Sequence, residues 1–143
     1  MKEKILIIQG HPDKAPTHFG HALGKAYQRG AETAGRSVKH INVAAVEFPL
    51  LHTKIEFDHG QIPLAIKNAQ GDILWADHIV IIYPLWLGTM PALLKGFFEQ
   101  VFRPGFAMRE STSGHLWEKL LKGKSARIIV TMGMPAFFIA GFF

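Results

Sequence analysis

Three loops of this sequence carry side chains that could bind a ligand, and each loop follows a run of aliphatic residues. The first loop, residues 9–18, contains His11 and leads through Thr17 and His18 into a segment with helical spacing. A helix N-terminus attracts anions, because its free N–H groups and the helix dipole both favour negative charge. A phosphate would therefore fit there. From the loop alone, a simpler interpretation is preferred, in which Thr17 is an N-cap and His11 a turn residue.

The other two loops offer apolar groups at positions where a flat ligand could lie. Residues 83–91 place Trp86 and Leu87 beside the small Gly88. Such side chains could stack against a planar ring while their backbone N–H groups bond its heteroatoms. Alternatively, Trp86 packs on a neighbouring helix or subunit. Residues 131–135 contain two methionines, which suit the side of a flat ring but are also ordinary fillers of gaps in a core.

Other chemistries have little support in the sequence. The glycine spacing after the first aliphatic run is neither G-x-G-x-x-G nor the Walker pattern. A G-x-S-x-G motif is missing, which argues against a hydrolase. Of the eight histidines only His18 and His21 have helical spacing, and no H-E-x-x-H motif occurs, so no metal site is expected. The absence of cysteine excludes disulfides, thiolate zinc sites and thiol catalysis.

Length and composition favour one globular domain. The 143 residues suffice for one core and not for two, so we expect a single domain over residues 1–143. The net charge of +5 comes without a basic stripe or an aromatic platform, and nucleic-acid binding is not expected. No segment approaches the roughly 20 apolar residues that span a bilayer, and the first apolar run is too short for a signal peptide. We therefore expect a cytoplasmic protein without membrane insertion.

The periodicity of apolar residues places the three loops at the ends of strands. Short aliphatic runs predict strands at residues 5–8, 37–43, 79–83 and 126–131. Apolar spacings of three and four predict a helix after Thr17 that ends near Gly35, a helix over 62–75, and a helix that opens at 89–91 and stops at 103–105. Residues 44–61 show no clear period. Alternating β and α elements predict a three-layer α/β sandwich with a mostly parallel sheet, whose ligands lie outside the carboxyl ends of the strands.

Four segments together carry a resemblance to a known family. They are the Gly10-His-Pro12 turn, the Thr17-His-Phe19 helix start, the segment Asp72 to Trp86, and the segment Met90 to Phe102. With these segments the chain resembles the flavodoxin-like NAD(P)H:quinone oxidoreductase family. That family includes quinone reductases, modulators of drug activity and ancillary subunits of potassium-efflux systems. The resemblance covers nearly the whole chain and implies a flavodoxin-like sandwich with strand order 2-1-3-4(-5).

The resemblance also implies a cofactor and an activity. The cofactor would be FAD or FMN, and hydride would pass in a ping-pong reaction from NAD(P)H through the flavin to a quinone-like acceptor. The residues implied in flavin binding are His11, Thr17, His18 and Phe19 for the phosphates and ribityl chain, Pro84, Leu85, Trp86 and Leu87 for one side of the ring, and Thr131, Met132, Gly133 and Met134 for its other side. Family members are typically homodimers that share the acceptor pocket.

The sequence departs from the family pattern at its C-terminal end. Family members usually continue through a fifth strand and a closing helix, so we interpret this chain as C-terminally truncated, with the fifth strand missing or incomplete. The family also uses a tyrosine and a histidine after the fourth strand. Here the tyrosines are Tyr27 and Tyr83 and the last histidine is His115, so no catalytic residue is assigned. The alternative function is a non-catalytic flavodoxin-like regulatory subunit or an inactive truncated fragment.

Overall fold

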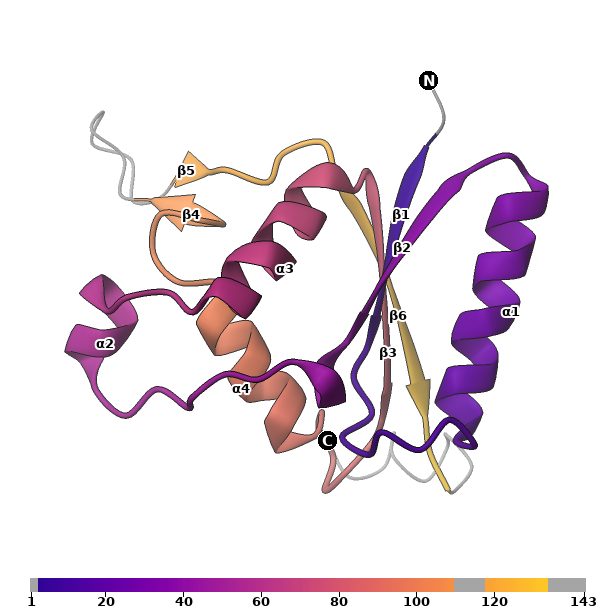
Figure 1. Cartoon of the computed structure of the whole chain (residues 1–143), viewed down its shortest axis with the longest axis horizontal. Coiled ribbons are helices and arrows are strands. Elements are labelled where there is room, and N and C mark those ends of the chain that lie inside the picture. Colours follow the sequence, from indigo (N-terminus) through magenta and orange to yellow (C-terminus); the bar gives the residue numbers. More distant parts are fainter. Residues whose placement is uncertain (1–2, 110–117, 134–143) are drawn as a thin grey trace.

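The main sheet has four parallel strands in the order that the sequence predicts. The structure is a computed structural model that describes residues 3–109 and 118–133. The strands are β1 (Lys4–Gln9), β2 (Ser37–Asn42), β3 (His78–Pro84) and β6 (Ser125–Thr131). Their order in the sheet is β2-β1-β3-β6, with every pairing parallel (Figure 1). The expected flavodoxin-like α/β fold with strand order 2-1-3-4 is therefore confirmed.

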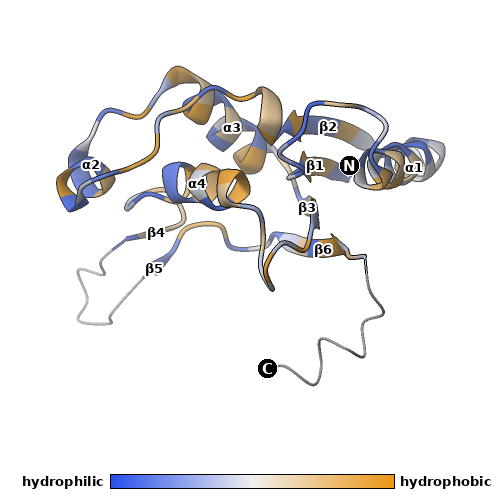
Figure 2. Ribbon diagram, turned by 90° about the horizontal axis from the view of Figure 1, so that it is seen from below, coloured by the Kyte–Doolittle hydropathy of each residue, from blue (hydrophilic) through white to orange (hydrophobic). Residues whose placement is uncertain are grey.

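Helices cover both faces of this sheet. Helix α1 (Phe19–Thr33) lies on one face, and α3 (Leu64–Trp75) and α4 (Ala92–Val101) lie on the other (Figure 1). Figure 2 looks along the sheet and shows the same separation, with α1 beyond one side of the strands and α3 and α4 beyond the other. The predicted three layers are thus present. Parallel strands are buried on both faces in such an arrangement, which explains why they read as continuous aliphatic runs.

Strand β1 shows how the sequence builds two cores at once. Side chains alternate between the faces of a strand. Leu6 and Ile8 accordingly join the larger apolar cluster with the helices α3 and α4, while Ile5 and Ile7 join the smaller cluster under α1. All four side chains are buried. The strand is followed by Gly10, where an added Cβ would lie 2.6 Å from Cδ2 of the buried Leu94, so the first loop begins tightly against α4.

Three sequence predictions about the helices need correction. The N-cap of α1 is His18 rather than Thr17, and its side chain makes no capping hydrogen bond. Thr17 therefore lies one residue too early to cap the helix. The helix predicted over 62–75 begins at Leu64, because Pro63 takes the extended N-cap conformation. The helix predicted to open at 89–91 starts one residue later, at Ala92, with Pro91 as its N-cap.

The structure also contains short elements that the sequence analysis did not predict. Residues 44–61, which show no clear period, contain α2 (Lys54–His59), and the 3₁₀ helix η1 (Val43–Ala45) overlaps their start. A capping box formed by Thr53 and Glu56 defines the start of α2. A separate antiparallel pair, β4 (Met108–Arg109) and β5 (Glu118–Lys119), lies outside the main sheet (Figure 2). Within the described residues, none of the helices has the length and apolarity that crossing a bilayer requires.

Candidate functional site

The three loops named from the sequence meet at the carboxyl edge of the sheet. The backbone N–H of Leu85 donates to the carbonyl of Thr131 at 2.7 Å, which joins the loop after β3 to the loop after β6. The rings of His11 and Trp86 lie edge to face with centroids 6.2 Å apart, which joins the loop after β1 to the loop after β3. The meeting is a consequence of the parallel sheet, since the carboxyl ends of all its strands share one edge.

The first loop is held by a hydrogen-bonded turn around Asp13. The N–H of Asp13 donates to Nδ1 of His11 at 3.1 Å, and the N–H of Ala15 donates to Oδ1 of Asp13 at 2.9 Å. Nε2 of His18 bonds the other carboxylate oxygen at 2.8 Å. These bonds lower the pKa of Asp13 below its usual value, with the N–H of Ala15 as the largest cause and His18 next. The loop therefore holds an ionised carboxylate and presents its two imidazoles in fixed orientations.

A cluster of three histidines forms where this loop enters α1. The rings of His11 and His18 are stacked, with centroids 3.8 Å apart and planes inclined by 16°. The ring of His21 lies in the first turn of α1, with its centroid 6.1 Å from that of His11 and 6.0 Å from that of His18. Both ring nitrogens of His21 are buried without a hydrogen-bond partner in the described structure. We call His11, His18 and His21 the histidine cluster.

Burial and mutual repulsion keep part of this cluster neutral. Burial is the largest cause that lowers the pKa of His11, followed by the charges of His18 and His21. Burial likewise lowers the pKa of His21, followed by the charges of His18 and Lys25. Both imidazoles are consequently neutral at neutral pH. They stand at a helix N-terminus that has no side-chain cap. The N–H of His21 donates to the carbonyl of His18 at 3.0 Å, whereas the N–H groups of Phe19 and Gly20 have no hydrogen-bond partner among the described residues and remain available to an anion.

The second loop is a tight turn that displays apolar groups. Trp86 and Thr89 exchange two backbone hydrogen bonds of 2.9 and 3.0 Å. The two residues between them, Leu87 and Gly88, have φ angles of 49° and 79°, as in type I′ turns. Left-handed backbone is unfavourable for a leucine by roughly 1–2 kcal/mol. The Trp86 side chain is 50% exposed and that of Leu87 is fully exposed. A strained turn that presents two large apolar side chains to solvent is typical of a binding surface.

The remaining expected site residues divide into three groups. Phe19, 68% exposed, stands at the start of α1 beside the histidine cluster. Pro84 and Thr131 end their strands as paired neighbours. Thr17 is exposed and makes no side-chain hydrogen bond among the described residues, while Met132 and Gly133 are exposed beyond β6. Met134 lies outside the described residues.

Sequence reasoning missed the roles of Asp13 and His21. In the sequence, the spacing of His18 and His21 suggests only a metal pair, which would need a third ligand on the same face. Within residues 3–109 and 118–133 there is no group of three or more His, Cys, Asp or Glu side chains arranged to hold a metal. The signal that could have pointed to His21 is its position three residues after His18, which puts both on the same side of the first helical turn.

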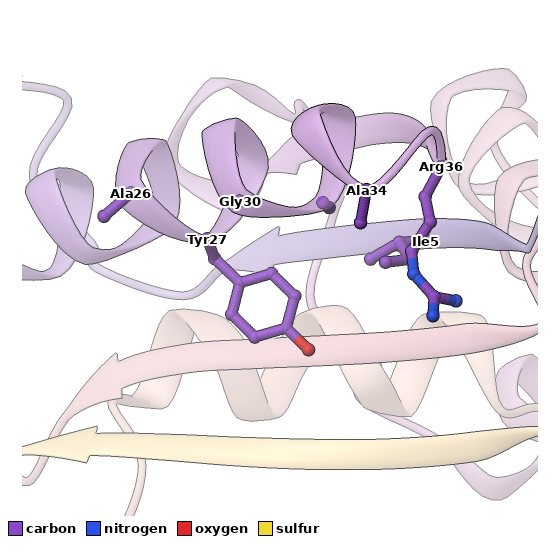
Figure 3. A pocket seen from close by; sticks show the side chains of 7 residues that line it. Ile5, Ala26, Tyr27, Gly30, Ala34 and Arg36 are labelled. Atoms are coloured by element: carbon purple, nitrogen blue, oxygen red, sulfur yellow. The ribbon is translucent and has the colours of Figure 1, made fainter.

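Two hollows flank α1, and only one of them adjoins the loops. A hollow of about 210 Å³ is lined by Gln9, His21 and Asn42 among others, and each of these three has a buried side-chain atom without a partner in the described structure. A hollow of about 290 Å³ lies at the other end of α1, between Tyr27, Arg36 and Ile5 (Figure 3). Because Ile5 is at the amino end of β1, the second hollow lies away from the histidine cluster and Trp86.

Two of the proteins that are similar to this chain in sequence are oxidoreductases by name. An NAD(P)H oxidoreductase of Haemophilus influenzae, itself described as uncharacterized, is 32% identical over 131 residues, which cover 90% of this chain and 63% of that relative. The chain thus spans less than two thirds of that protein's length. An FMN-dependent NADH:quinone oxidoreductase of Burkholderia lata is 39% identical over 62 residues, covering 43% of this chain and 27% of that protein.

The fold has counterparts among solved structures. The NAD(P)H:quinone oxidoreductase of Methanothermobacter marburgensis superposes with a TM-score of 0.81 at 21% identity, covering 99% of this chain and 73% of that one. At this identity the likeness shows the fold alone. The sequence pattern of the flavodoxin-like fold matches residues 3–142. The chain therefore belongs to the flavodoxin-like fold family.

Proposed function

We propose that the carboxyl edge of the sheet binds a flavin and that the protein is an NAD(P)H oxidoreductase that reduces a quinone or a similar acceptor. One observation carries the proposal. A helix N-terminus lined by histidines and a turn that exposes Trp86 and Leu87 lie side by side, with the rings of His11 and Trp86 6.2 Å apart. A flavin has the two parts that such a pair of surfaces would hold, an anionic phosphate tail and a flat apolar ring.

The residues of the first loop fit the phosphate end of this cofactor. Backbone N–H groups at the start of α1 would donate to phosphate oxygens, and the helix dipole would favour the negative charge. His11 and His18 would approach the phosphate from the stacked pair, and Thr17, though not an N-cap, would have its exposed hydroxyl free to donate. The unpartnered nitrogens of His21 fit as well, because they would stabilise the negative charge of a nearby anion.

The residues of the other two loops fit the ring. Trp86 and Leu87 would cover one side of it, and the chain from Pro84 onward would offer backbone N–H groups to its heteroatoms. The residues from Thr131 to Met134 would flank the other side. Apolar contact here would exclude water from the reacting face. We also propose that two copies of the chain form a dimer, as expected from the family resemblance.

The chemistry would come from the cofactor and its orientation from the protein. A bound flavin supplies a ring that can take two electrons from a nicotinamide and give them to an acceptor. The names of the relatives from Haemophilus influenzae and Burkholderia lata support NAD(P)H as donor, a flavin as cofactor and a quinone as acceptor. The protein groups would hold donor and acceptor in turn against the same face. Their contribution is proximity and orientation.

Reconstitution tests the proposal directly. The purified chain is incubated with FMN and, separately, with FAD, and passed through a desalting column. Retained visible absorbance shows which flavin binds. Oxidation of NADPH and of NADH is then followed with menadione as acceptor. Sedimentation of the loaded protein reports whether it is a dimer.

Each result has a distinct meaning. Retained flavin together with menadione-dependent oxidation supports the proposed function. Flavin that is retained without turnover favours the alternative of a non-catalytic flavodoxin-like subunit. A folded chain that retains neither flavin contradicts the proposal.

A further inference from the structure

We propose that the cofactor phosphate binds together with a proton, which the histidine cluster of His11, His18 and His21 takes up from solvent. This inference rests on the proposed function, because it assumes that the first loop receives a flavin phosphate. It goes beyond that function in making phosphate binding dependent on pH. The covalent change is confined to one new N–H bond on an imidazole, and the proton is supplied by the buffer.

The charge around the first loop supplies the first argument. The Asp13 carboxylate is ionised and lies 2.8 Å from Nε2 of His18. A phosphate monoester adds about −1.5 to −2 charges at neutral pH, whereas a helix N-terminus offers only about +0.5. Among residues 3–109 and 118–133, no lysine or arginine side chain forms an ion pair or hydrogen bond with residues 10–18. The loop's own cation, Lys14, is exposed and forms no ion pair in the described part of the chain, so no cation held in place balances the Asp13 carboxylate and a bound phosphate.

The geometry of the cluster supplies the second argument. The stacked rings of His11 and His18 and the adjacent ring of His21 bring three imidazoles within about 6 Å of one another at the helix N-terminus. Both nitrogens of His21 are buried and have no hydrogen-bond partner within residues 3–109 and 118–133, so one of them is free to receive a proton. Nδ1 of His11 accepts the Asp13 N–H, which leaves its Nε2 to donate. The cluster therefore has a vacant protonation site on His21 and a donor on His11 next to the place where the anion would lie.

The groups that face His21 decide the direction of the effect. His11 and His18 face it from the loop, and Lys25 faces it from α1, while Asp13 is the only nearby group of opposite charge among the described residues. On the side of the sheet, Gln9 and His40 line the same hollow and carry no charge at neutral pH, since burial lowers the pKa of His40. Positive neighbours and burial keep His21 neutral while the site is free. A phosphate dianion reverses that balance, because a nearby opposite charge favours the protonated imidazole.

Two flavins that differ only in the phosphate separate this inference from the proposed function. FMN and riboflavin are titrated into the chain at pH 7 and pH 8 by calorimetry, in one buffer of small and one of large ionisation enthalpy, both free of phosphate. We expect FMN to take up a fraction of a proton and riboflavin none. The ratio of the riboflavin Kd to the FMN Kd should fall from pH 7 to pH 8 by up to about tenfold, the limit for one linked proton.

Variants locate the proton. His21→Phe keeps a ring of similar size and removes two unpartnered buried nitrogens, so the fold should be retained. It should reduce both the proton uptake and the pH dependence of the ratio. His52→Gln, which changes an exposed histidine elsewhere in the chain, should alter neither. Proton uptake that persists in the His11→Asn/His18→Asn/His21→Phe triple variant would place the proton outside the cluster and overturn the inference.

An experiment without flavin tests the proton uptake independently of the proposed function. Inorganic phosphate is added while the ring resonances of the histidines are followed by NMR against pH. A rise in the titration midpoint of His11 or His21 with phosphate supports the inference even if no flavin binds. Unchanged midpoints, or FMN binding whose enthalpy is the same in both buffers, would overturn it. Failure of both flavins to bind contradicts the proposed function alone.

Discussion

The hydrogen bonding of histidine differs between the two edges of the sheet. At the amino edge, His78 at the start of β3 has a hydroxyl partner for each ring nitrogen. Nδ1 lies 2.7 Å from Oγ of Ser125, and Nε2 lies 3.3 Å from the hydroxyl of Tyr27. At the carboxyl edge, both ring nitrogens of His21 are buried and unpartnered in the described structure. The same side chain is fully satisfied at one edge and unsatisfied at the other.

The difference distinguishes polar side chains that are hydrogen-bonded within the fold from polar side chains that are available to a ligand. Buried polar groups in folded proteins nearly always have partners, so an unsatisfied group calls for an explanation. At the amino edge the Tyr27–His78–Ser125 chain ties α1 to two strands and needs nothing further. At the carboxyl edge, unpartnered nitrogens coincide with exposed Trp86 and a strained Leu87. Unsatisfied polar groups and exposed apolar groups in one place are the expected signs of a ligand site.

The largest effect is expected when the aromatic side chain of Trp86 is removed from the carboxyl edge. Trp86→Ala should weaken FMN binding by about 1–3 kcal/mol, the range for a base stacked on an aromatic side chain, if the ring of the flavin stacks there. Tyr27→Phe at the amino edge should leave the FMN Kd unchanged. Fluorescence titration of FMN measures both variants. An unaltered Kd for Trp86→Ala would reassign Trp86 to contact with another subunit.

The next test removes a partner at the amino edge. Ser125→Ala leaves Nδ1 of His78 without its hydroxyl partner, and an unsatisfied buried group costs about 1–3 kcal/mol of folding free energy. Because His78 is only partly buried, we expect a loss near the lower end of that range. Urea unfolding measures it. FMN affinity should not change, and a stability equal to that of the unmodified chain would show that the hydrogen bond is replaced by water.

A third test separates strain from binding in the turn after β3. Leu87→Asn converts the turn to Asn-Gly, the preferred pair for a type I′ turn. Relief of the left-handed leucine should raise the free energy of unfolding by at most about 1 kcal/mol. Loss of the exposed apolar side chain should weaken FMN binding at the same time. Thermal unfolding and FMN titration of the same sample check both. If stability rises while the FMN Kd stays the same, Leu87 does not contact the flavin.

The smallest expected effect is a pH dependence of stability. The pKa values of His11, His21, His40 and His78 are all lowered, in each case chiefly by burial. The unfolded chain therefore binds more protons than the folded chain below about pH 6.5, and stability falls as the pH falls through the lowered values. Above that pH the dependence should vanish. Urea midpoints from pH 5 to 8 measure it, and His21→Phe should flatten the curve. A midpoint that rises on acidification would contradict the assignment.

The sequence also indicated which loops would meet at the carboxyl edge of the sheet, and its failures there have physical causes. The aliphatic runs mark the strands because both faces of a parallel strand are buried, and the loops that follow them must share an edge. The capping box of Thr53 and Glu56 was present in the sequence, but the six-residue helix after it is too short for periodicity to reveal. Thr17 looked like an N-cap by residue type, whereas the backbone begins the helix one residue later.

By itself the sequence determined the strands, their order, the main helices and the three loops, because local apolar periodicity and family-specific segments carry that information. Only the tertiary structure decided that His11 stacks on His18 and meets Trp86, that the ring nitrogens of His21 have no partner among the described residues, and that His78 is satisfied by Tyr27 and Ser125. Most of these relations join residues distant in sequence, and even those within the first loop depend on how the turn and α1 pack. They depend on burial and ring orientation, and a list of residue types encodes neither.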